Sequence, residues 1–277
     1  MRPGALCVAL AVLLAAAPAE AAWELALEGQ LVQGGLARGM AAPGATVTFE
    51  GRQVPVAPDG GFVIGFGRDS GPAARLVVTW PDGKEELRQL EIGGRAWKVQ
   101  RIDGLPSRKV TPSPEDLQRI AAESELLQRA RARATPRRYD AGTFLWPAAG
   151  RISGVYGSQR ILNGEPRQPH LGVDIAAPAG TPVVAAAEGV VSLTHPDMFF
   201  TGKTVVIDHG LGLGSIYVHM SEILVKDGER VRRGQRIGRI GRSGRATGPH
   251  LHWGVHWFDV RLDPALLAGP MPEPRAP

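Results

Sequence analysis

Cysteine is almost absent from this sequence of 277 residues. The only one, Cys7, lies in the apolar stretch near the start of the chain. Because the rest of the chain holds no thiol, a disulfide scaffold, a thiol enzyme and a cysteine-ligated zinc module are all excluded. Stability must therefore come from burial of a hydrophobic core, and a chain with 43% hydrophobic residues is long enough to form one.

Long hydrophobic runs are also missing, apart from residues 5–17. This run follows Met-Arg-Pro and precedes Ala19-Glu20-Ala21, a pattern typical of a secretory signal with its cleavage site. It is shorter than the ~20 apolar residues of a bilayer span, which disfavours a membrane anchor. We predict a signal peptide over residues 1–21, export to the periplasm in preference to the wall or the medium, and no membrane span after cleavage.

The patterning of the remaining chain predicts a mostly β protein. Residues 22–101 alternate short apolar runs with turn signals at Asp59-Gly60-Gly61 and Pro81-Asp82-Gly83, which indicates a small β-sandwich-like domain. This stretch contains no histidine. We interpret it as a spacer or as a module that docks on a protein partner.

Residues 102–138 are predicted to form a linker that contains a helix at about 113–134. Ser113-Pro114-Glu115-Asp116 combines a capping serine, a proline in the first turn and two acids, the pattern of a helix start. Residues 139–268 return to short Val/Ile runs bounded by Gly and Asp, which predicts an antiparallel β-sheet domain. Residues 269–277 form a proline-rich tail.

All seven histidines lie in this third part, between residues 170 and 256. Neutral imidazole is the commonest metal ligand and also titrates near neutral pH, so the cluster predicts a metal site or an acid–base site. His170 and Asp174 are four residues apart, and His250 and His252 are two apart, so each pair lies on one face of an extended strand. Two imidazoles and a carboxylate form a zinc ligand set. The two pairs together hold one side chain more than this set needs.

At these residues the sequence resembles the lysostaphin/LytM-type zinc metallopeptidases, which cut peptidoglycan cross-links. The resemblance covers residues 150–264 and is carried by four segments in the family's order: PHLGVDIAAPAGTPVVAAAEGVV, VVIDHG, SIYVHMSEI and GPHLHWGV. It implies a β-sheet groove with the metal on its floor. The glycine-rich stretches 150–164 and 241–248 would form its walls, and Arg160, Asn163 and Arg167 would border the site.

The resemblance implies one zinc ion per chain, with His170, Asp174 and His252 as its ligands. It places the two non-ligand catalytic histidines at His219 and His250, and it does not tell which of them is the general base. The implied substrate is the stem peptide of peptidoglycan. Whether the bond cut joins D-Ala to diaminopimelate or belongs to a glycine bridge stays open.

The three other histidines are interpreted without a direct catalytic role. We expect His209 to satisfy a local hydrogen bond or to support the site, and His195 and His256 to lie at the surface or at the rim of a pocket. Residues 226–245 hold eight basic residues and two acids. We hypothesise that this stripe faces the carboxylates of stem peptides.

Three other classes of protein compete with the peptidase interpretation. A lipoyl or biotinyl carrier would need an exposed lysine motif that the chain lacks. A non-catalytic wall-binding or amidase-activating protein on the same fold would be expected to lack metal ligands. The basic stripe has no interleaved aromatic residues on which bases could stack, and export also argues against nucleic acid as a partner.

Overall fold

The computed structural model describes residues 24–137, 142 and 144–272. The predicted signal peptide over residues 1–21 lies outside the described residues, as does the end of the tail. The fold is mostly β with antiparallel sheets, as the sequence predicts. None of the helices in the described ranges is both long and apolar enough to cross a membrane.

The N-terminal part consists of two antiparallel sheets. One is three-stranded in the order β1-β2-β5 and the other is four-stranded in the order β4-β3-β6-β7. Both predicted turns form: Gly60 and Gly83 adopt positive φ, and the Asp59 and Asp82 side chains accept backbone hydrogen bonds two residues on. The strands are β1 (Ala26–Gly29), β2 (Leu36–Met40), β3 (Thr46–Phe49), β4 (Arg52–Val54), β5 (Gly61–Gly65), β6 (Ala73–Thr79) and β7 (Glu85–Glu91).

The C-terminal part is built on one ten-stranded sheet with the main order β17-β14-β15-β16-β19-β12-β9. Its strands are β9 (Arg151–Gly154), β12 (Val173–Ala176), β13 (Pro182–Val184), β14 (Gly189–Met198), β15 (Gly202–Gly210), β16 (Leu213–Ile223), β17 (Arg230–Val231), β18 (Arg236–Ile240), β19 (His250–Trp257) and β20 (Val260–Leu262). A short helix, α3 (Pro264–Ala268), follows β20.

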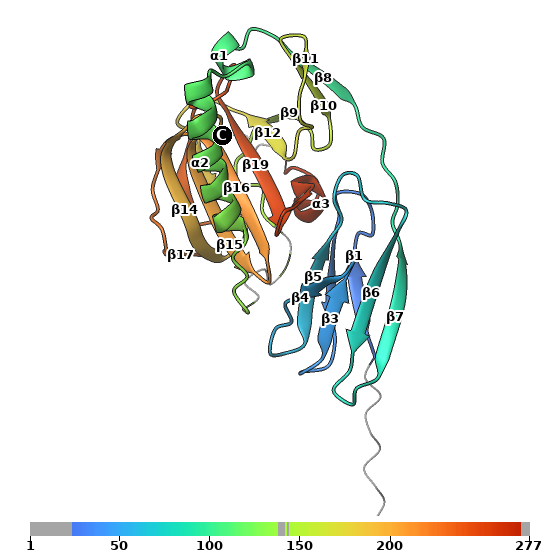
Figure 1. Cartoon of the computed structure of the whole chain (residues 1–277). Coiled ribbons are helices and arrows are strands. Elements are labelled where there is room, and N and C mark those ends of the chain that lie inside the picture. Colours follow the sequence, from blue (N-terminus) through green and yellow to red (C-terminus); the bar gives the residue numbers. More distant parts are fainter. Residues whose placement is uncertain (1–23, 138–141, 143, 273–277) are drawn as a thin grey trace, which may run out of the picture.

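The linker does not stand between two separate bodies, because its elements join the C-terminal part. Strand β8 (Val99–Ile102) pairs in parallel with β10 (Gln159–Leu162), which also pairs with β11 (Glu165–Pro166). Helix α1 (Ser107–Val110) follows, and then α2 (Pro114–Arg131) crosses β14, β15 and β16 (Figure 1). The boundaries predicted at residues 102 and 139 therefore stay predictions.

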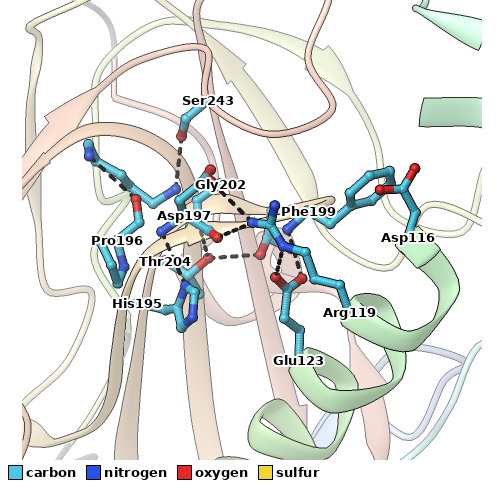
Figure 2. Close-up of polar contacts among 12 residues, drawn as sticks. Asp116, Arg119, Glu123, His195, Pro196, Asp197, Phe199, Gly202, Thr204 and Ser243 are labelled. Atoms are coloured by element: carbon cyan, nitrogen blue, oxygen red, sulfur yellow. Dashed lines mark hydrogen bonds and ion pairs between the residues drawn. The ribbon is translucent and has the colours of Figure 1, made fainter. Parts of the chain in front are cut away.

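Two kinds of contact hold α2 on the sheet. Its Ala130 packs in an apolar cluster with Val206, Ile216 and Val218. Nearer the start of the helix, Arg119 pairs with Asp197 of β14 at 3.1 Å, and a second pair within the helix, with Glu123 at 2.6 Å, orients the Arg119 side chain (Figure 2). The helix thus covers one face of the sheet, and the functional side chains lie on this same face.

The two β parts also share a continuous core. Phe49 of β3 packs edge-on against Trp257 of β19, with 5.9 Å between ring centroids. A Cβ added at Gly65 of β5 would lie 3.0 Å from the Cβ of Trp257, so the strand fits there because it has no side chain. Arg95 and the buried Asp263 form an ion pair at 2.8 Å. This packing fixes the start of β8 relative to the C-terminal sheet.

The start of α2 provides a test of this arrangement. Ser113 accepts a hydrogen bond from the Asp116 amide, and Asp116 accepts one from the Ser113 amide, so the two residues form a capping box. We expect Ser113→Ala to lower the free energy of unfolding by about 1 kcal/mol, the usual cost of losing a helix cap. Urea denaturation measures the change. Ser124→Ala, on an exposed position of the same helix, is the matched control and should lose nothing. Equal losses in the two variants would contradict the prediction.

Candidate metal centre

Strand register brings together the side chains that the sequence separates by 78 residues. In the antiparallel β12–β19 pair Asp174 lies directly opposite His252, and in the β16–β19 pair Val218 lies opposite His252. Directly opposed residues project from the same face of a sheet. Because Val218 packs in the cluster under α2, Asp174 and His252 lie on the face that α2 covers.

Three side chains converge at this point of the sheet. The Oδ1 atom of Asp174 lies 2.9 Å from His170 Nε2 and 2.8 Å from His252 Nδ1, and the two nitrogens are 2.9 Å apart. All three ligand atoms lie within 4.8 Å of one another. The structure thus brings together the three residues that the resemblance implies as metal ligands.

The protonation states suit a cation. Burial alone would raise the pKa of Asp174, but hydrogen bonds with His170 and His252 outweigh burial and hold that pKa well below its ordinary value. Burial lowers the pKa of His252 to about 4. At neutral pH the carboxylate is therefore ionised, and His252 is neutral with a lone pair to offer.

Glycines open the space that these ligands fill. A Cβ at Gly154 would lie 2.4 Å from Asp174 Oδ2, and a Cβ at Gly172 would lie 2.7 Å from the His252 ring. Two imidazoles and one carboxylate are a set that zinc takes, with a fourth position left for water or substrate. The residues present therefore fit a zinc ion.

Arg160 holds the carboxylate ligand in place. Its Nη2 donates to Asp174 Oδ2 at 2.7 Å, so Oδ1 alone faces the two histidines. Arg160 lies on β10, next to β8 of the linker. The sequence placed Arg160 only in a segment that borders the site, because no local spacing relates it to Asp174.

His219 reaches the site through an unusual backbone conformation. Strict alternation along β16 would turn it away from the face that carries Val218. Its φ of 65° is left-handed, which histidine adopts more readily than most residues, and the ring turns back to the site. The His219 and His250 rings lie 4.7 Å apart between centroids. Strain of this kind is typical of functional sites.

Both of these histidines have one nitrogen engaged by a backbone carbonyl. His219 Nδ1 lies 2.8 Å from the Ser243 carbonyl oxygen, and His250 Nδ1 lies 2.9 Å from that of Gly248. A carbonyl accepts, so Nδ1 carries the proton and Nε2 carries the lone pair in the neutral rings. Burial, followed by repulsion from His250, lowers the pKa of His219 to about 3. His250 Nε2 lies 4.0 Å from Asp174 Oδ1, beside the ligand cluster.

Asp174, His219 and His250 line a cavity of about 340 Å³. Its walls include both predicted glycine-rich stretches, together with Gln100 and Ile102 of β8 and the nearby Leu105, which the sequence did not place there. Three arginines line it: Arg151, Arg160 and Arg245. Of the eight basic residues in 226–245, only Arg245 reaches this cavity, so most of the stripe lies elsewhere.

The remaining histidines lie outside the cavity. His209 is buried, with its nitrogens 2.6 Å from the Glu188 carbonyl oxygen and 2.8 Å from Ser215 Oγ, so the expected local hydrogen bonds form. His195 is half-buried and its Nδ1 accepts from the Asp197 amide. The expectation for His256 is wrong: it is only 3% exposed, because Gly214 on the neighbouring strand leaves room for its ring.

Comparisons with known proteins agree with this geometry. A profile of peptidase family M23 matches residues 168–264. The peptidoglycan DD-endopeptidase ShyA of Vibrio cholerae is 53% identical over 87 residues, which cover 31% of this chain and 20% of that protein. The DD-carboxypeptidase/endopeptidase Mpg of Neisseria meningitidis is 40% identical over 104 residues, which cover 38% of this chain and 24% of that protein. The chain thus spans about a fifth to a quarter of these curated relatives.

A solved structure extends the likeness beyond the sheet. The crystal structure of a Pseudomonas aeruginosa protein assigned to peptidase M23 is 33% identical and superposes with a TM-score of 0.68. The match covers 87% of this chain and 96% of that chain. The N-terminal β part and the linker therefore belong to a shared architecture.

Metal binding can be measured directly. We expect the full chain to bind one zinc ion, and His252→Ala to lose it, because two donors hold zinc far more weakly than three. Metal content after dialysis is the readout. His195→Ala, a histidine outside the cavity, is the control and should keep its zinc. Retention of zinc by His252→Ala would remove His252 from the ligand set.

The contact of Arg160 leads to a separate expectation. We expect Arg160→Gln to weaken zinc affinity about 10–100-fold, the usual effect of removing a group that orients a metal ligand. Competition with a zinc indicator measures the affinity. Arg167→Gln is the control, because Arg167 donates to the Val110 carbonyl and does not touch Asp174. An unchanged affinity in Arg160→Gln would show that the contact does not position Asp174.

Proposed function

Because the chain belongs to peptidase family M23, we propose that it is an exported zinc-dependent endopeptidase that hydrolyses peptide cross-links of bacterial peptidoglycan. The observation that carries this proposal is the convergence of His170, Asp174 and His252 beside two histidines with free Nε2 atoms. A non-catalytic wall-binding protein would not need the second pair. In the proposal His219 and His250 are catalytic, and His170, Asp174 and His252 hold the metal.

The chain's own residues account for binding and proton transfer. Asp174, His170 and His252 would hold zinc, which supplies Lewis acidity to the scissile carbonyl and the attacking water. His250 Nε2, which lies beside the ligand cluster and is not engaged by the Gly248 carbonyl, can accept a proton from that water. His250 can then pass that proton to the leaving amine, while the adjacent His219, oriented by the Ser243 carbonyl, accepts a hydrogen bond at its free Nε2.

The charge of the cavity favours an anionic substrate. Arg151 and Arg245 line it without any carboxylate partner among the described residues, and Asp174 is the only acid in its lining. In a D-Ala–diaminopimelate link, a free carboxylate sits on the carbon next to the amide nitrogen that is cut. A glycine bridge offers no such group. We therefore propose that the D-Ala–diaminopimelate bond is the substrate, and the names of the relatives ShyA and Mpg support this choice.

Purified sacculi test the activity. We expect the full chain to release cross-link-cleaved fragments, a chelator to abolish release, and excess zinc to restore it. His219→Ala should lose at least about a hundredfold of the rate, the usual size of acid–base catalysis, while it keeps its zinc. The comparison of released fragments by mass spectrometry identifies the bond. Zinc-loaded protein that leaves sacculi intact would favour the non-catalytic alternative.

The basic cavity provides a test of substrate recognition. We expect Arg245→Gln to raise KM about tenfold on a diaminopimelate-containing dimer, because a charge-assisted hydrogen bond contributes about 1.5–3 kcal/mol, and to change kcat little. Arg236→Gln, from the same basic stripe but outside the cavity, is the matched control. If both variants kept the KM of the parent chain, Arg245 would have no part in recognition.

A further inference from the structure

A second cavity, of about 590 Å³, shares no lining residue with the one at the metal centre. It lies where the end of α2 meets β4 of the N-terminal part and the β19–β20 turn. We call it the arginine pocket, because Arg52, Arg131 and Arg261 line it, and Asp259 is the one acid in its lining within the described part of the chain. The other lining residues are Ser124, Gln128, Ala132 and Phe258.

The only carboxylate in the arginine pocket is already engaged. Asp259 pairs with Arg52 at 2.5 Å, and Arg52 also stacks on the Phe258 ring at 5.2 Å. Among the described residues no carboxylate pairs with Arg131 or Arg261. Arg131 Nε and Arg261 Nη1 are buried and have no hydrogen-bond partner. Two guanidinium groups thus line one pocket, and each has an N–H donor without a hydrogen-bond acceptor.

Strand pairing and helix packing place these two arginines beside the same pocket. Arg261 lies opposite His256 in the β19–β20 pair, and His256 lies opposite Gly214. His256 is buried behind them and neither of its ring nitrogens has a partner. On the other side, packing of Ala130 against Val206 and Ile216 sets the position of the next residue, Arg131.

Both guanidinium groups carry their charge at neutral pH. Burial, followed by repulsion from Arg261, lowers the pKa of Arg131 to about 9, which still leaves it protonated. Burial also lowers the pKa of Arg261. Burial, followed by repulsion from Arg131 and Arg261, holds the pKa of His256 well below its ordinary value, so His256 is neutral. Asp259 interacts with Arg261 as well as with Arg52, but one carboxylate cannot balance three arginines. The pocket therefore keeps a net positive charge, and burying charge that is not fully paired is costly.

We propose that the arginine pocket binds a phosphate group, held by Arg131 and Arg261. A phosphate carries about −1.5 to −2 charges at pH 7, which matches the two guanidinium groups, and its oxygens accept the paired N–H bonds that arginine offers. Ser124 and Gln128 supply neutral donors for the remaining oxygens. Bound phosphate would join α2 to the catalytic sheet next to the N-terminal part.

Calorimetric titration of the full chain tests the proposal at constant ionic strength. We expect one inorganic phosphate to bind per chain with zinc loaded and also after chelation, which separates the arginine pocket from the metal centre. Glycerol 3-phosphate in a parallel titration distinguishes the sources. Tighter binding than inorganic phosphate indicates a phosphate carried by a larger molecule, and equal or weaker binding indicates the free ion. Acetate should bind far more weakly, and equal binding of acetate would overturn the assignment to phosphate.

Variants locate the bound phosphate. Arg131→Gln and Arg261→Gln should each weaken phosphate binding at least about tenfold, as expected when a hydrogen bond between charged groups is lost. Arg129→Gln is the matched control, because Arg129 lies on the same helix and pairs with the exposed Glu125. Unchanged affinity in Arg131→Gln, or an equal loss in Arg129→Gln, would overturn the proposal.

Thermal unfolding provides a second readout that does not depend on calorimetry. Without phosphate, Arg131→Gln should be at least as stable as the parent chain, because it removes an unpaired buried charge. With phosphate in excess, the parent chain should gain in Tm by mass action and the variant should not. If phosphate left the Tm of the parent chain unchanged, the proposal would be wrong, and water would be the partner of the unused arginine donors.

Discussion

The site depends on one carboxylate whose two oxygens serve different neighbours. Asp174 Oδ1 faces His170 and His252, and Oδ2 accepts from Arg160. Burial alone would raise the pKa of this carboxyl, and the hydrogen bonds from the histidines reverse the effect. The register of β12, β19 and β16 opposes Asp174 to His252 and His252 to Val218, which places the carboxylate and His252 on one face of the sheet.

The linker is part of the architecture around the metal centre and not a tether. Strand β8 adds to β10, the strand that carries Arg160, and Gln100, Ile102 and Leu105 line the cavity at the metal centre. Helix α2 covers the rest of the same face and ends at the arginine pocket. The N-terminal sandwich, through Phe49 and Arg95, anchors the start of this linker.

Much of the fold and of the candidate site was predictable because it rests on local patterns. The turns at Gly60 and Gly83, the capped start of α2 and the His250–His252 pair each arise from a few neighbouring residues. His256 was misplaced because its burial depends on the missing side chain of Gly214, across a strand pair. The hypothesis that the basic stripe faces stem-peptide carboxylates stays a prediction, and of its residues only Arg245 lines the cavity at the metal centre.

The sequence by itself determined the mostly β class, the absence of thiol chemistry and the set of histidines from which the site is built, because composition and short spacings carry that information. Only the tertiary structure decided that Arg160 holds Asp174, that a left-handed backbone turns His219 toward His250, and that Arg131 and Arg261 share a pocket. Each of these depends on strand register or helix docking between distant segments, and such long-range contacts leave no local pattern in the chain.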